Sequence, residues 1–327
     1  MSAWLWIMSA GSAAVFALYG LRCAKAVRFP ILRKRAWGTA LLSFLFSVVF
    51  GTVLSRVGYA LLMQELDFEY DGIAALGQLL EFEFDTVSFL FAALGVILGV
   101  LLANRLLRKE ASAAGMDAFA PFGALLAALF RLGELFLGSC GAGGNLPEES
   151  PLAFFPFAMK IEVAGGYSYW AWAVCVLSAL FALVWAGIAF FRLRGKGRPG
   201  LLFTLTLFFL ALPQILCESM RHNVSMIWLF VHVEELLCAV VLLCVMLFWV
   251  LKTGGGLSFL RRWGPLAVLL LGAALLVGVE FAIDGKYFGL PVPVCYLIMC
   301  AVLAAVGWAG ALAAKNWNAA ETGKEAL

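Results

Sequence analysis

Long apolar segments separated by short polar loops fill almost the whole chain. A helix needs about 20 apolar residues to span the hydrocarbon core of a bilayer. Nine segments approach that length, at residues 3–21, 37–62, 86–107, 118–139, 169–191, 200–217, 226–251, 264–283 and 290–314. Because backbone groups in lipid must be satisfied internally, and alternating strand patterns are few, we expect an all-α transmembrane bundle of about nine helices rather than a barrel.

The composition agrees with this class. Of the 327 residues, 64% are hydrophobic and 13% are charged, and the mean hydropathy is +0.99. Soluble domains carry about 25% charged residues, so the chain is expected to be an integral membrane protein. The net charge of +3 reflects basic loops, and no nucleic-acid partner is expected.

Charged residues in the loops predict the orientation of the helices. Basic residues follow the first, third, fifth, seventh and ninth segments: Arg22, Lys25, Arg28, Arg33, Lys34, Arg35, Arg105, Arg108, Lys109, Arg192, Arg194, Lys196, Arg198, Lys252, Arg261, Arg262, Lys315 and Lys324. The loop at 64–85 holds seven acidic residues and neither Lys nor Arg. Under the positive-inside rule, we expect the N-terminus outside and the C-terminus inside. The first segment lacks a basic leader region, so we expect a retained helix rather than a signal peptide.

Ionisable residues interrupt the apolar segments. Arg131 and Glu134 lie three residues apart in one segment, and Glu218 and Arg221 repeat this spacing at the end of another. Side chains three residues apart share a helix face, so each pair can neutralise itself. A charge near mid-bilayer costs about 2.5–3.5 kcal/mol on insertion scales and persists when it is paired, hydrated or functional.

The predicted topology brings further polar residues to the same depth. Arg56 lies in the outer third of the second helix, and His232, Glu234 and Glu235 lie in the first turns of the seventh. Such clustering predicts a polar chamber open to the outer leaflet. Structural ion pairs remain the alternative for either pair alone, and His232 is either a proton carrier or a hydrated interfacial side chain.

Other features give weaker indications. The glycine-rich run at 138–144 fits a backbone cradle for a lipid phosphate or an ordinary helix end. Most of the eight cysteines lie in apolar helices, where small buried side chains are the rule, although a disulfide between Cys140 and Cys217 remains an alternative. The chain contains no P-loop, no HExxH motif and no nucleophile elbow, and we expect neither a metal nor a cofactor.

Several short motifs, in sequential order, resemble those of prolipoprotein diacylglyceryl transferases. They are Gly51-Thr-Val-Leu-Ser-Arg56-Val-Gly-Tyr59-Ala-Leu, Val87-Ser-Phe followed by Gly95, Ala120-Pro121, Phe130-Arg131-Leu-Gly133 with Gly138, and Glu218-Ser-Met-Arg221. The resemblance covers roughly residues 3–251. It therefore divides the chain into a seven-helix transferase-like membrane domain at 1–251 and two additional helices with a short cytoplasmic tail at 252–327.

The resemblance implies a function at the outer leaflet of a bacterial plasma membrane. Members of this family move diacylglyceryl from phosphatidylglycerol to the cysteine thiol of a lipoprotein precursor and release glycerol phosphate. Arg131 stands at the signature arginine, Arg56 beside the glycine and tyrosine of the second helix, and Glu218 at an acidic position of the sixth. The chain departs from the family at Leu90 (histidine), Glu134 (asparagine), Ser139 (glutamate), Gln214 (arginine) and Tyr167-Ser168-Tyr169 (a His-Pro-Ser-Gln segment).

These residues define the predicted site and its partners. We expect Arg56, Arg131, Gln214 and Arg221 to bind the substrate, because guanidinium groups match phosphate oxygens. One of Glu134, Glu218 or Glu235 is expected to act as the general base, since desolvation favours proton uptake by a carboxylate.

The expected partners are phosphatidylglycerol or another anionic phospholipid, and a lipoprotein precursor. Two alternatives remain open. One is an inactive relative that binds phospholipid or lipoprotein. The other is a small-solute transporter, which fits less well because no internal repeat is recognisable.

Overall fold

The computed structural model describes residues 3–25, 30–62, 88–108, 112–136, 141–163, 167–191, 197–221, 227–228, 231–253, 258–283 and 290–322. Within these ranges, nine helices are long and apolar enough to cross a membrane. The chain is therefore a multi-pass membrane protein with an all-α bundle, which confirms the fold class predicted from the hydrophobic pattern. The acidic loop at 64–85, Ser139, Cys140 and several of the basic loop residues lie outside the described residues.

The bundle consists of α1 (Ala3–Lys25), α2 (Pro30–Leu62), α4 (Phe89–Arg108), α5 (Ser112–Gly133), α6 (Val174–Phe191), α7 (Leu201–Met220), α8 (Val233–Lys252), α9 (Phe259–Ile283) and α10 (Val292–Thr322). A single 3-10 turn, η3 (Glu134–Phe136), continues α5. The strands are β1 (Asn145–Leu146), β2 (Ala158–Val163), β3 (Tyr167–Trp172), β4 (Ile227–Trp228) and β5 (Val231–His232).

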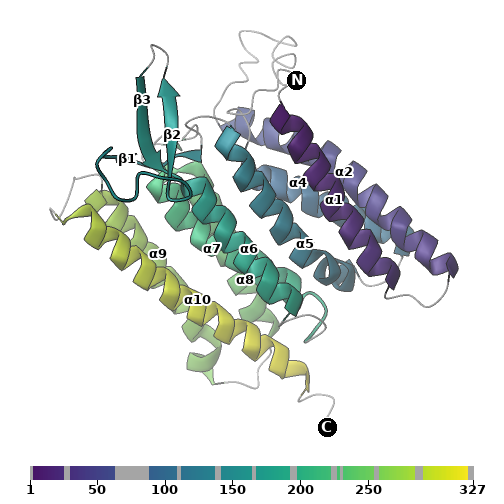
Figure 1. Cartoon of the computed structure of the whole chain (residues 1–327). Helices are drawn as coiled ribbons and strands as arrows, with labels where there is room; N and C mark the ends of the chain where they lie inside the picture. Colours follow the sequence, from purple (N-terminus) through teal and green to yellow (C-terminus); the bar gives the residue numbers. More distant parts are fainter. Residues whose placement is uncertain are drawn as a thin grey trace, which may run out of the picture.

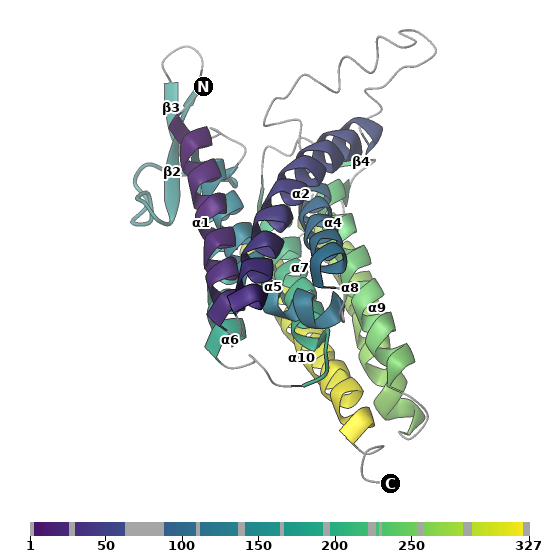
Figure 2. The same cartoon turned by 90° about the vertical axis from the view of Figure 1, so that its right-hand side faces the viewer.

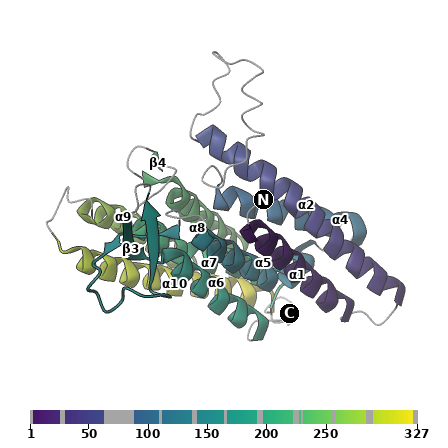
Figure 3. The same cartoon turned by 45° about the horizontal axis from the view of Figure 1, so that its top comes forward.

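The helices form one bundle with a small sheet at one end. Helices α1, α2 and α4 lie on one side, α9 and α10 on the other, and α5 to α8 between them (Figures 1 and 3). Helix α1 begins at the end that carries the β2–β3 hairpin, and α10 ends at the opposite end (Figures 1 and 2). Opposite ends are what an odd number of crossings requires. That the hairpin end faces outward stays a prediction from the loop charges.

The two largest apolar cores among the described residues hold the bundle together. One joins α1, α2, α4 and α5 around Phe16, Tyr19 and Phe122. The other joins α6 to α10 around Phe208 and Trp249, with smaller contributions from α5. Helix α10 also packs directly against α7 and α8. The two C-terminal helices therefore share a core with the middle of the bundle.

Glycines allow α2 and α4 to approach closely. A Cβ at Gly99 would lie 2.6 Å from the backbone nitrogen of Ser47, and one at Gly95 would clash with the backbone of Phe50. Small residues spaced four apart are a common basis of helix contact in membranes. This contact holds the first turn of α4 beside the C-terminal half of α2.

Two of the predicted helices start later in the chain than expected. The segment predicted at 169–191 opens as β3, which pairs antiparallel with both β1 and β2, and its helix starts at Val174. The segment predicted at 226–251 opens with the short β4–β5 pair, and α8 starts at Val233. Hydropathy does not separate these strands from a helix, because aromatic and β-branched residues are both apolar and strand-forming.

The opposite end of the bundle is fixed by a side-chain cap. Asp117 of α5 accepts hydrogen bonds from the backbone amides of Gly200, at 2.6 Å, and Phe203, at 2.8 Å. Gly200 precedes α7 with φ +90°, a conformation that suits glycine. The first amides of a helix have no partner within the helix, so a carboxylate from α5 satisfies them and fixes α5 against α7.

Replacing Asp117 with alanine should lower the free energy of unfolding by about 1–2 kcal/mol, because the α7 amides lose their acceptor. Unfolding in mixed micelles of mild detergent and dodecyl sulfate would measure the loss. Asp117→Asn keeps one acceptor oxygen and should lose less. Equal stability of wild type and Asp117→Ala would show that the cap contributes nothing.

Candidate functional site

The predicted polar residues gather where α5 and α7 end and where α4 and α8 begin. Arg131 lies in the last turn of α5, and Glu134 opens η3 directly after it. Glu218 lies in the last turn of α7, and Arg221 follows that helix and forms an isolated β-bridge with Gly143. All of these lie at the hairpin end of the bundle, so the small sheet adjoins the site.

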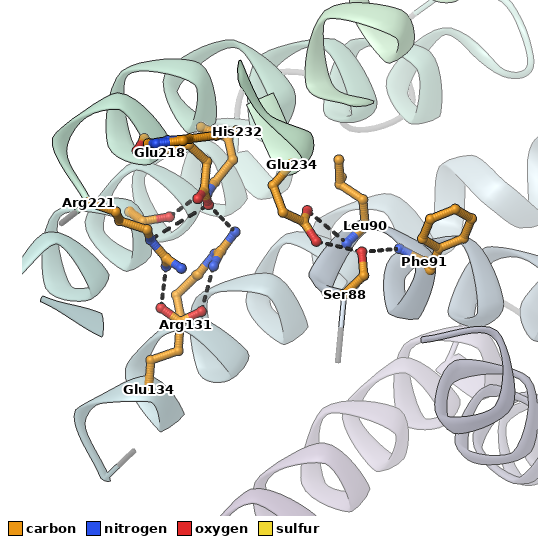
Figure 4. Close-up of polar contacts among 11 residues, drawn as sticks. Ser88, Leu90, Phe91, Arg131, Glu134, Glu218, Arg221, His232 and Glu234 are labelled. Atoms are coloured by element: carbon orange, nitrogen blue, oxygen red, sulfur yellow. Dashed lines mark hydrogen bonds and ion pairs between the residues drawn. The ribbon is translucent and has the colours of Figure 1, made fainter. Parts of the chain in front are cut away.

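Arg131, Glu134, Glu218 and Arg221 form a closed ring of ion pairs, which we call the ion-pair ring (Figure 4). Arg131 donates from Nη1 to Glu134 Oε1 at 2.5 Å and from Nη2 to Glu218 Oε1 at 3.2 Å. Arg221 donates from Nη2 to Glu134 Oε2, and its Nε lies 3.6 Å from Glu218 Oε1. With two cations and two anions, the ring is neutral.

The ring is almost completely buried, but its exposure is uneven. The side chains of Arg131 and Glu218 are 2% and 1% exposed, whereas those of Arg221 and Glu134 are 11% and 7% exposed. The Arg221–Glu134 edge is therefore the more open side. Because burial strips water from every member, each charge depends on its partners in the ring.

Neighbouring helices hold the ring in place. Gln214 donates from Nε2 to Glu218, and Ser178 of α6 donates to Gln214 Oε1 at 2.8 Å. The guanidinium carbon of Arg131 lies 3.9 Å from the centre of the Phe89 ring, a cation–π contact from α4. Four helices thus orient these side chains, as a preformed binding site requires.

Arg221 is a permanent cation in this setting. Burial alone would lower its pKa, but the carboxylates of Glu218 and Glu134 outweigh burial and hold the pKa of Arg221 above its ordinary value. Arg221 therefore contributes a full positive charge to the ring.

A second polar cluster lies beside the ring and centres on Glu234 (Figure 4). Ser88 donates from Oγ to Glu234 Oε1 at 2.5 Å, and the Leu90 amide donates to Oε2 at 3.3 Å. Ser55 of α2 donates in turn to the Ser88 carbonyl at 2.9 Å. Unlike the ring carboxylates, Glu234 accepts its described hydrogen bonds from a hydroxyl and an amide.

Glu235, the base predicted on α8, is less deeply buried than its neighbour Glu234, which was not among the predicted site residues. Glu234 belongs to the buried stripe of α8 that continues through Cys238, Leu242 and Val245. Glu235 is half-buried on the next face, and Glu280 of α9 is its strongest electrostatic neighbour. The spacing of the stripe is the signal that would have distinguished the two.

Other predicted residues border this region. Arg56 is buried on α2, with its guanidinium 5.7 Å from the centre of the Tyr59 ring, and in the chain it directly follows Ser55 of the Glu234 cluster. The Nδ1 atom of His232 lies 2.9 Å from the carbonyl oxygen of Glu218. The structure thus brings Arg131, Glu134, Gln214, Glu218 and Arg221 together, while Glu235 faces α9.

Two weaker features of the sequence also lie at this end of the bundle. Cys217 is a buried free thiol rather than half of a disulfide. In the part of the glycine-rich run that the structure describes, the Gly143 amide donates to the Trp172 carbonyl at 2.7 Å, and the Gly144 carbonyl accepts from Trp172. The Gly143 amide is therefore committed to the sheet, because strand pairing competes with any ligand for the same donor.

Within the described ranges, no group of His, Cys, Asp and Glu could hold a metal ion.

Comparison of the chain with protein families, with characterised proteins and with solved structures found no match. The features that bear on function are therefore the ion-pair ring, the Glu234 cluster and the sequence motifs.

Proposed function

We propose that this chain is a divergent phosphatidylglycerol–prolipoprotein diacylglyceryl transferase that acts on phospholipid at the outer leaflet of a bacterial plasma membrane. The main observation in support is the convergence of Arg131 and Arg221 on the two oxygens of one carboxylate. Two guanidiniums aimed at one small anion, at the end of a transmembrane bundle, suit a lipid phosphate.

The reaction makes two demands on the site. The thiol of the lipoprotein precursor must lose its proton so that sulfur forms a bond to the glyceryl carbon. The bond from that carbon to the phosphate oxygen breaks, and its electron pair leaves with glycerol phosphate. Arg131 and Arg221 would neutralise the charge that develops on that oxygen, which is the usual role of fixed cations in phosphoryl leaving-group chemistry.

We assign proton uptake to Glu234 in preference to Glu134, Glu218 and Glu235. Both ring carboxylates are already engaged in ion pairs with guanidiniums. Glu234 is instead held by Ser88 and by the amide of Leu90, the residue that stands at the family's histidine position. Glu234 therefore lies next to the position where the family carries a histidine, which is the residue type best suited to act as a base near neutral pH.

The proposal can be tested by complementation. A bacterium depleted of its own diacylglyceryl transferase should regain lipoprotein modification when it expresses this chain. Arg131→Gln should fail to restore it at equal protein level in the membrane. Unmodified lipoprotein despite abundant wild-type protein would count against a transferase.

A second candidate is an inactive relative that binds phospholipid or lipoprotein. Leu90 and the neutral ring favour it, since the histidine is replaced and two carboxylates are occupied. An inactive relative would retain phosphatidylglycerol and form no transfer product. Arg131→Ala would weaken this retention. A transporter would instead show solute counterflow in vesicles.

A further inference from the structure

Glu134 bridges the two guanidiniums of the ion-pair ring. One oxygen accepts from Arg131 and the other from Arg221, so a single carboxylate joins guanidiniums from α5 and from the end of α7. Two oxygens of a phosphate group present the same pair of acceptors to a guanidinium clamp.

We propose that Glu134 is a resident anion that fills the phosphate position between Arg131 and Arg221, and that a phosphate-bearing lipid binds by displacing it. The choice of a lipid over free phosphate rests on the proposed function. The displacement itself rests on the geometry and charge of the ring.

Charge balance requires exchange rather than addition. The ring holds two guanidiniums and two carboxylates, and a further anion would leave an uncompensated charge among side chains that are no more than 11% exposed. Burying an unpaired charge is strongly unfavourable. A phosphodiester carries one negative charge, so it replaces one carboxylate without changing the balance.

Glu134 is the carboxylate suited to leave. Glu218 lies within the regular turns of α7, is 1% exposed and accepts a further hydrogen bond from Gln214. Glu134 lies in the single 3-10 turn after α5, and its described hydrogen bonds come from the two guanidiniums alone. It also lies, with Arg221, on the more open edge of the ring.

The exchange has a measurable consequence for affinity. If the state with Glu134 displaced is a minor one, the apparent affinity for the lipid is reduced by its fractional population. Glu134→Gln removes the competing charge and should bind phosphatidylglycerol roughly tenfold to a hundredfold more tightly than wild type, the range expected for minor states of about 1–10%.

The experiment measures lipid dissociation constants by native mass spectrometry of the full chain in detergent. The probes are phosphatidylglycerol, diacylglycerol as the matched lipid without phosphate, and inorganic phosphate. Glu218→Gln is the matched control, because it changes the ring by the same charge but leaves Glu134 in place. Glu134→Asp is the second variant, for use if the glutamine variant does not fold, since its shorter side chain reaches the two guanidiniums less well.

Tighter phosphatidylglycerol binding by Glu134→Gln, or by Glu134→Asp, with no comparable gain in Glu218→Gln or for diacylglycerol, is the expected result. Equal gains in Glu134→Gln and Glu218→Gln would overturn the proposal, because charge alone would explain them. The absence of tighter phosphatidylglycerol binding in both Glu134 variants would also overturn the proposal. Binding of inorganic phosphate but not of phosphatidylglycerol would overturn the lipid as the source of the phosphate.

These outcomes are distinguishable from failure of the transferase function. If wild type transfers diacylglyceryl but the Glu134 variants gain no affinity, the displacement proposal is wrong and the transferase function stands. If the variants gain affinity but no form of the protein makes product, the transferase function alone is wrong.

Discussion

Replacing Arg131 with glutamine is expected to lower the free energy of unfolding by about 3–5 kcal/mol and to abolish retention of phosphatidylglycerol. Removing one partner of a buried ion pair leaves the opposite charge without compensation, which is costly in a site with little water. Arg131 is 2% exposed and bonds to both ring carboxylates, so its loss leaves Arg221 to neutralise Glu134 and Glu218 together. Unfolding in mixed micelles and lipid analysis of the purified protein would measure the two effects.

A double variant separates lost charge balance from lost packing. Adding Glu134→Gln to Arg131→Gln removes one cation and one anion, so part of the stability should return while lipid retention stays low. Coupling between residues in one buried network is commonly about 0.5–3 kcal/mol. Strictly additive effects of the two substitutions would show that the ring is not a coupled unit.

The second large effect is expected at Glu234. Replacing it with glutamine should reduce the rate of diacylglyceryl transfer by about 10²–10⁴, the usual contribution of a general base. Phosphatidylglycerol retention should change little, because the described contacts of Glu234 are with Ser88 and Leu90 rather than with the guanidiniums. Single-turnover transfer to a peptide thiol, at saturating lipid, measures the rate.

Two further variants make this assignment falsifiable. Glu148, exposed in the loop after β1, is a control for removing a carboxylate, and Glu148→Gln should transfer at the wild-type rate. If Glu235→Gln loses more activity than Glu234→Gln, the base lies on the face of α8 towards α9, and the assignment to Glu234 is wrong.

The membrane spans were predictable because lipid imposes their length and hydropathy on each segment separately. The two pairs spaced three residues apart were also recognised as neighbours on a helix face. The ion pairs that join one pair to the other were not predicted. Arg131 bonds to Glu218 as well as to Glu134, and Arg221 bonds to Glu134. Spacing along one helix carries no information on how α5 and α7 are turned towards each other.

Two other features of the site were not predicted because they also depend on contacts between distant segments of the chain. The choice between Glu234 and Glu235 depends on which face of α8 meets α4, although the buried stripe of α8 held part of that information. The role of the Gly143 amide depends on β3, and hydropathy assigned part of that strand to a helix. Contacts between distant segments decided each case.

Diacylglyceryl transfer by the purified protein tests the central claim most directly. In phosphatidylglycerol vesicles with a peptide that carries the lipoprotein cysteine, wild type should form a diacylglyceryl thioether and an equal amount of glycerol phosphate. Mass spectrometry would detect both products, and Arg131→Gln should form neither. Absence of product from wild type, in vesicles where an established diacylglyceryl transferase is active, would contradict the account.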